Sequence, residues 1–199
     1  MPSDHLDPAL AGWMTDLAHQ EHDHQVLTEL GIRARETGRD LLDHAVGRLL
    51  EVLARAGGAQ RVVDLGTGLG AAAHWLARGV GEHGRVHTAG APDDVAVAEQ
   101  ALRRMELWER VEATATDDPV AVLADHAEGS LDLVHVGLPP APAAHEAAVP
   151  RLRVGGLLVA QHALTDEGRA LARHAAEDFR VAVSVLPIAT GVLLAVRVE

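Results

Sequence analysis

The chain contains no cysteine, lysine, tyrosine or asparagine, and these absences exclude several kinds of chemistry. Without cysteine there can be no disulfide, no thiolate nucleophile and no cysteine zinc site. Without lysine there can be no Schiff base, and arginine is too basic to accept a proton at neutral pH. General acid and base roles therefore fall to aspartate, glutamate and the 13 histidines.

The charge balance and hydropathy also limit the partners of the protein. Its 17 basic and 29 acidic side chains give a net charge of -12, which would repel a phosphate backbone or an anionic lipid surface. No apolar run approaches the ~20 residues of a membrane span. We therefore expect no nucleic-acid partner and no membrane association. The polar first seven residues predict no signal peptide, which favours a cytoplasmic protein.

The chain length of 199 residues suits one hydrophobic core, which we place in residues 39–199. Residues 1–38 are expected to form a helical segment that serves as a lid or a dimer contact. They include His19, His22 and His24, a polar group that favours a solvated helix end or loop over a metal site.

Short β-branched segments alternate with amphipathic ones through the rest of the chain. The predicted strands are residues 61–65, 85–89, 111–115, 131–136 and 156–160, and the predicted helices are residues 40–56, 71–78, 93–105, 120–126 and 141–149. The apolar runs 179–186 and 192–198 predict a final antiparallel hairpin. The expected fold is an α/β, doubly wound, mostly parallel seven-stranded sheet of Rossmann-like type, with a ligand at the carboxyl ends of its strands.

The most informative segment is the glycine turn Asp64-Leu65-Gly66-Thr67-Gly68-Leu69-Gly70, between a predicted strand and a predicted helix. Glycines here allow unusual backbone angles and a close approach of the main chain to a ligand. Two ligands compete for it. The spacing Gly66-x-Gly68-x-x-Ala71 also satisfies a dinucleotide fingerprint. A carboxylate at Asp64 would repel a pyrophosphate but suit the ammonium of S-adenosylmethionine, which we favour.

Five segments together resemble the class I S-adenosylmethionine-dependent methyltransferases. They are residues 61–70, 84–88, 131–134, 152–160 and 186–197. The chain is most similar to the small catechol and caffeoyl-CoA type O-methyltransferases, over about residues 30–199. The resemblance implies S-adenosylmethionine as cofactor, methyl transfer to a small-molecule hydroxyl, and a homodimer.

The resemblance also implies which residues contact the cofactor. These are Asp64, Gly66, Thr67, Gly68, Gly70, Ala72, Gly90, Ala91, Asp117, Asp118 and Gly137. Two of them depart from the family pattern. Gly90 stands where the family has an acid for the ribose, and Ala72 stands where it has a hydroxyl for the cofactor carboxylate.

Carboxylates near these positions have alternative explanations. Asp93 or Asp94 could replace the ribose acid, although both also suit the amino-terminal turn of a helix. Asp117 or Asp118 corresponds to an acid beside the adenine, and both also suit a turn before Pro119.

The metal site implied by the family is missing. Its magnesium ligands correspond here to Gly137, Gln161 and His162, and its lysine corresponds to Pro140, so we predict no metal. His162 is the candidate general base, with a loop-capping histidine as the alternative. His135 is expected to pack inside the sheet.

The favoured function is therefore a metal-independent S-adenosylmethionine-dependent O-methyltransferase. The alternative is a degenerate methyltransferase fold that serves as a binding or dimer-partner subunit, because several family residues are lost together. An NAD-linked oxidoreductase is the third hypothesis.

Overall fold

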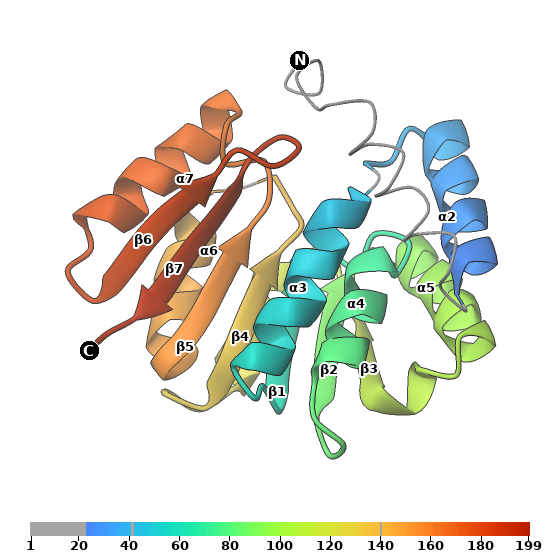
Figure 1. Cartoon of the computed structure of the whole chain (residues 1–199), viewed down its shortest axis with the longest axis horizontal. Helices are drawn as coiled ribbons and strands as arrows, with labels where there is room; N and C mark the ends of the chain where they lie inside the picture. The colour runs from blue at the N-terminus through green and yellow to red at the C-terminus, as the bar shows by residue number, and fades with distance from the viewer. Residues whose placement is uncertain (1–22, 41, 140) are drawn as a thin grey trace.

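The computed structural model describes residues 23–40, 42–139 and 141–199, and its centre is a seven-stranded sheet (Figure 1). The strand order is β3-β2-β1-β4-β5-β7-β6. The strands are β1 (Arg61–Leu65), β2 (Arg85–Gly90), β3 (Val111–Ala115), β4 (Leu131–Val136), β5 (Leu152–Ala160), β6 (Val181–Leu186) and β7 (Val192–Arg197). The first five strands pair in parallel, and β7 pairs antiparallel with both β5 and β6. The predicted fold is confirmed.

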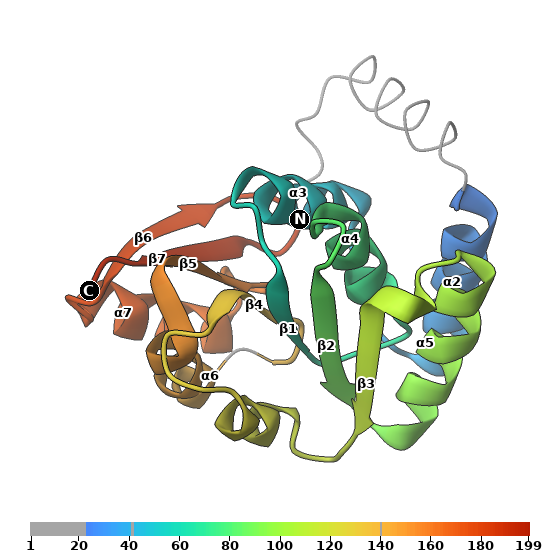
Figure 2. The same ribbon diagram turned by 90° about the horizontal axis from the view of Figure 1, so that it is seen from below.

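Helices cover the sheet in two layers, with α3 and α4 over one face and α6 and α7 over the other (Figure 2). The α-helices are α2 (His24–Thr37), α3 (His44–Ala56), α4 (Ala71–Gly79), α5 (Pro92–Arg104), α6 (Pro142–Ala148) and α7 (Asp166–Glu177), and the 3-10 helices are η2 (Trp108–Arg110), η3 (Pro119–Asp125) and η4 (Val149–Arg151). Residues of one strand alternate between the two layers. Val62 packs with α3 and α4, whereas Val63 packs in the layer of α6 and α7.

Several predicted bounds were wrong for local reasons. The helix predicted from residue 40 begins at His44, because the Asp43 carboxylate accepts a hydrogen bond from Ala45 N (2.8 Å) and caps the helix there. The segment 120–126 forms the 3-10 helix η3 instead of an α-helix. The predicted elements lack α7, in which only Gly168, Leu171 and Ala175 are buried, so its apolar stripe is too sparse to stand out.

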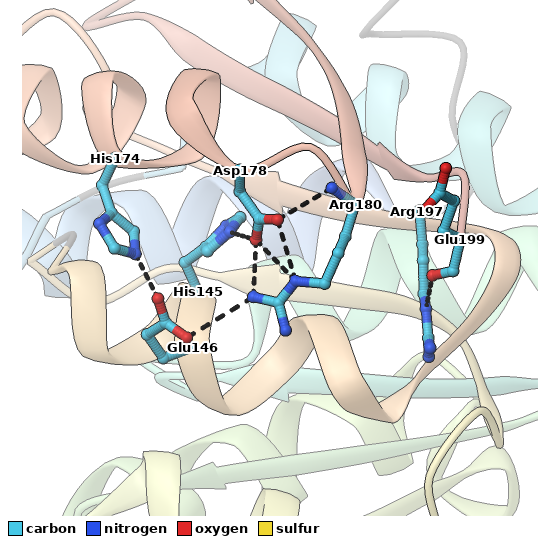
Figure 3. Close-up of polar contacts among 7 residues, drawn as sticks. All are labelled: His145, Glu146, His174, Asp178, Arg180, Arg197 and Glu199. Carbon is cyan, nitrogen blue, oxygen red and sulfur yellow. Dashed lines mark hydrogen bonds and ion pairs between the residues drawn. The ribbon is translucent and has the colours of Figure 1, made fainter.

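The strand predicted from residue 179 begins only at Val181, because a polar cluster occupies the connection before it (Figure 3). The Asp178 carboxylate accepts hydrogen bonds from Arg180 N (2.9 Å), Arg180 Nη2 (2.7 Å) and His145 Nε2 (2.9 Å). Arg180 also pairs with Glu146, whose other oxygen is 2.6 Å from His174 Nε2. The cluster joins α6, the end of α7 and the segment that leads into β6.

Candidate active site at the carboxyl edge of the sheet

The glycine turn has left-handed backbone angles at Gly66 (φ +98°), Gly68 (φ +50°) and Gly70 (φ +91°). A Cβ added at Gly66 would lie 2.7 Å from Leu138 Cδ2, and one added at Gly70 would lie 2.9 Å from Ala98 Cβ. At Gly68 the nearest atom would be the Gly66 carbonyl oxygen at 3.9 Å. The turn therefore packs tightly at its ends and leaves space beside Gly68, where a ligand could approach the backbone.

Helix α4 begins directly after this turn, and no side chain in the described part of the chain caps it. Its first-turn N–H groups therefore remain for a ligand or for water. Ala72, expected near the cofactor, is 7% exposed and packs in the core. Any contact from this position would come from the backbone.

A row of polar side chains crosses the sheet beside the turn, and we name Thr67, Thr88, Asp64, His135 and Gln161 the polar row. The first four are buried and Gln161 is half-buried. The Asp64 carboxylate accepts from Thr88 Oγ1 (2.8 Å) and lies 2.7 Å from His135 Nδ1. Thr88 Oγ1 is also 2.8 Å from Thr67 Oγ1, and His135 Nε2 is 3.0 Å from Gln161 Nε2. The row links the glycine turn to the end of β5.

Strand register explains why these side chains meet. Asp64 is the register partner of Thr88 on β2 and of His135 on β4, so the three side chains share one face of the sheet. His135 pairs with Val159, and Gln161 lies two residues beyond Val159 on the same side. The expectation that His135 is enclosed in the sheet is confirmed. The sequence did not predict the hydrogen-bond partners of its two ring nitrogens, Asp64 and Gln161. Asp64 is also 0% exposed, so its carboxylate lies within the polar row and not on the open side of the turn.

The end of β2 is closed where the family has its ribose acid. A Cβ at Gly90 would lie 2.9 Å from Thr67 N, and Ala91 beside it is half-buried. Asp93 is exposed, and Asp94 pairs with Arg39 Nη2 at 2.5 Å. The two carboxylates line a cavity of about 380 Å³ that also includes Leu69 of the glycine turn.

The structure explains Asp118 as a turn residue. Its Oδ1 accepts a hydrogen bond from Ala121 N (3.3 Å) and caps η3, and its own N–H donates to Thr116 Oγ1 (3.1 Å). Asp117 is exposed beside it. Both lie after β3, on the side of the sheet where the resemblance places the adenine.

Gly137, Gln161 and His162 meet at the ends of β4 and β5, and all three are half-buried. His162 has a positive φ of 60°; its Nδ1 is 3.0 Å from Thr190 Oγ1 and its Nε2 is 3.8 Å from Asp40 Oδ2. His162 therefore has a hydroxyl partner and a nearby carboxylate. Within the described ranges, no group of three or more histidine or acidic side chains could hold a metal ion.

The family model described as "O-methyltransferase" matches residues 18–198 of this chain. The chain belongs to the O-methyltransferase family. A protein of Mycolicibacterium vanbaalenii whose name assigns it to the O-methyltransferases is 32% identical over 200 residues, covering 90% of this chain and 88% of its own. The predicted family, and with it an S-adenosylmethionine-dependent O-methyltransferase, is confirmed.

Two crystal structures show the same fold. A methyltransferase from Geobacter sulfurreducens has a TM-score of 0.85 and 27% identity, with 98% of each chain covered. An O-methyltransferase from Bacillus cereus in complex with SAH has a TM-score of 0.80 and 20% identity, covering 95% of this chain and 97% of its own. Among the described residues of this family member, no helix is both long and apolar enough to span a bilayer.

Proposed function

We propose that this O-methyltransferase acts without a metal ion, on a hydroxyl of a small-molecule acceptor. The observation that carries the proposal is the side-chain set at the ends of β4 and β5. Gly137 offers no side-chain ligand, Gln161 offers one neutral amide, and His162 offers an imidazole. Magnesium prefers several hard oxygen ligands, which this set does not provide.

The backbone of the site fits S-adenosylmethionine better than its side chains do. The space beside Gly68 and the uncapped start of α4 support binding of the cofactor through main-chain N–H groups. Asp64 and Gly90 support no direct grip, because one carboxylate is enclosed and the other position has no side chain. When bound, the cofactor would supply a methyl group attached to a sulfonium, with a neutral thioether as the leaving group. The protein would contribute mainly proximity and orientation.

His162 is the proposed general base for the acceptor hydroxyl. It stands at the carboxyl end of β5, and its carbonyl oxygen accepts from Thr165 N (3.0 Å) and Thr165 Oγ1 (2.8 Å), which fixes the backbone. Its Nε2 lies 3.8 Å from the Asp40 carboxylate, which is 89% exposed.

Calorimetric titration with S-adenosylmethionine, S-adenosylhomocysteine and NAD tests this assignment. We expect binding of the first two and none of NAD. Methyl transfer to a panel of small phenols and alcohols should then be the same with Mg²⁺ as with EDTA. Binding of none of the three ligands would instead favour the degenerate, dimer-partner subunit, and a loss of transfer in EDTA would refute the metal-independent mechanism.

The His162→Ala variant tests the proposed base. We expect at least a tenfold fall in turnover with unchanged cofactor affinity, because general-base catalysis contributes about 10²–10⁴-fold. His83→Ala, in an exposed turn at the opposite edge of the sheet, is the matched control. Unchanged turnover of the His162 variant would remove His162 from the mechanism.

We also propose a homodimer formed through the face of β5, β7 and β6 on the α3 side. A cavity of about 510 Å³ there is lined by apolar side chains including Leu157, Leu194 and Val196, and Val196 is 37% exposed. A second copy of the chain would bury this surface. The contribution of residues 1–22 to a lid or a dimer contact lies outside the described residues. A cytoplasmic location stays a prediction.

A further inference from the structure

We propose that Gln161 positions the acceptor by accepting a hydrogen bond through its Oε1, and that the buried Asp64–His135 pair fixes the orientation of its amide. This inference rests on the proposed function, because it concerns the acceptor side of the same site. It assigns a role to the side chain that stands in one of the family's metal-ligand positions.

The hydrogen-bond inventory of His135 determines which amide atom faces it. An ionised Asp64 can only accept, so His135 Nδ1, at 2.7 Å from it, carries the proton. In a neutral imidazole, Nε2 must then accept a hydrogen bond. The partner at 3.0 Å is Gln161 Nε2, which has two hydrogens to donate. The amide is thus held with its nitrogen toward His135.

The other end of the Asp64 carboxylate is satisfied as well. Thr88 donates to it, and Thr67 lies within hydrogen-bond distance of Thr88. The hydrogen bonds of the row can therefore run inward from both ends, from Thr67 and from Gln161, toward the fully buried Asp64 carboxylate. A rotated Gln161 amide would place Oε1 against an unprotonated Nε2 and break this pattern. The polar row thus favours one amide orientation.

Gln161 lies at the edge of the sheet where an acceptor would bind. Gln161 is half-buried at the carboxyl end of β5, next to His162, and a Cβ at Gly137 would lie 3.5 Å from its Nε2. Among the described residues, none donates a hydrogen bond to Gln161 Oε1. An O–H or N–H group of the acceptor can fill this place, while the reacting hydroxyl faces His162.

Nitrogen-15 NMR of histidine-labelled protein tests the orientation directly. At pH 8 we expect His135 in the tautomer with Nδ1 protonated and Nε2 bare. In Gln161→Glu, a second carboxylate would face Nε2 and favour the doubly protonated ring. A wild-type His135 that carries its proton on Nε2, or on both nitrogens, would overturn the proposal.

Kinetics test the contact with the acceptor. The probes are phenols that carry a second hydroxyl and their singly O-methylated counterparts. For Gln161→Leu we expect KM for the dihydroxy probes to rise about tenfold, the effect of about 1.4 kcal/mol, with kcat within about twofold. KM for the methylated probes should not change, and Gln161→Glu should restore most of the loss because it still presents an acceptor oxygen.

Two controls separate this proposal from the proposed function. Gln60→Leu removes an exposed amide at the start of β1, on the opposite edge of the sheet, and should leave both probe sets unaffected. Gln161→Leu should bind S-adenosylhomocysteine like the wild type. If the wild type does not bind S-adenosylhomocysteine, the proposed function fails. The tautomer of His135 would still decide the orientation of the Gln161 amide. Equal KM changes for both probe sets would refute the role of Oε1.

Discussion

Removal of the Asp178 carboxylate should destabilise the protein by about 2–3 kcal/mol. In Asp178→Ala, the largest cost arises at His145, which loses its hydrogen-bond partner. It is 0% exposed, its Nε2 has Asp178 as partner, and its Nδ1 has no hydrogen-bond partner among the residues that the structure describes. Truncation therefore leaves a buried imidazole with neither nitrogen satisfied, which costs about 1–3 kcal/mol. Loss of the charge-assisted hydrogen bonds from Arg180 adds to this free-energy cost. The addition is small because the Arg180 guanidinium still pairs with Glu146 and can bind water.

Urea unfolding followed by circular dichroism measures this change. We expect a lower midpoint with an unchanged m-value, and a Tm lower by roughly 5–10 °C for a chain of this length. Asp166→Asn is the matched control, because that carboxylate is 89% exposed beside Arg169 and should matter by less than about 0.5 kcal/mol. Adding His145→Phe to Asp178→Ala should recover about 1 kcal/mol, because the double variant no longer buries an unsatisfied ring.

The pH dependence gives a second check on the same cluster. Hydrogen bonds from the Arg180 side chain, above all, hold the pKa of the Asp178 carboxyl far below its ordinary value. A depressed carboxyl pKa stabilises the fold above the unfolded pKa of about 4, and this contribution is lost as pH falls toward the folded pKa. The difference in unfolding free energy between wild type and Asp178→Ala should be largest at pH 7 and should shrink below pH 4. A variant within 0.5 kcal/mol of wild type at pH 7 would refute the reasoning.

Two further predictions concern a buried histidine and the proposed dimer. Burial lowers the pKa of His74 to about 3, so the unfolded chain takes up a proton below pH 6.5 that the folded chain refuses. From pH 7 to pH 5 the wild type should lose about 2 kcal/mol more of its unfolding free energy than His74→Phe, measured by urea midpoints; equal losses would contradict this. Val196→Glu should shift the protein from dimer to monomer in size-exclusion chromatography with light scattering, whereas Ile32→Glu, on the distant helix α2, should not. A monomeric wild type would disprove the dimer.

The strand pattern of the fold could be predicted because the sheet strands are short, β-branched and separated by clear turn signals. Residues 61–65 and 131–136 match β1 and β4 without correction. Helix α7 could not be predicted in this way, because only three of its residues are buried and its apolar pattern is weak. The start of β6 also could not be predicted, because it depends on contacts of Asp178 with a helix more than 30 residues earlier in the chain.

The candidate site was predictable in its position and only partly in its chemistry. The glycine turn and His162 lie at the predicted edge of the sheet. The sequence alone could not reveal that Asp64 is shared with His135, because that contact depends on the register between β1 and β4. Register is decided by the whole sheet and not by a local motif. The sequence held one signal for this contact: Asp64 and His135 are polar residues on predicted strands. Those strands prove to be neighbours in the sheet.

The tight contact between β2 and the glycine turn constrains how this protein could change during evolution or engineering. A side chain at Gly90 would collide with the main-chain nitrogen of Thr67, which cannot rotate away as a flexible side chain could. A carboxylate at this position therefore requires the glycine turn to move, and that movement would disturb the hydrogen bond from Thr67 to Thr88. Restoring a ribose-binding acid would therefore require a change in the glycine turn as well as at Gly90.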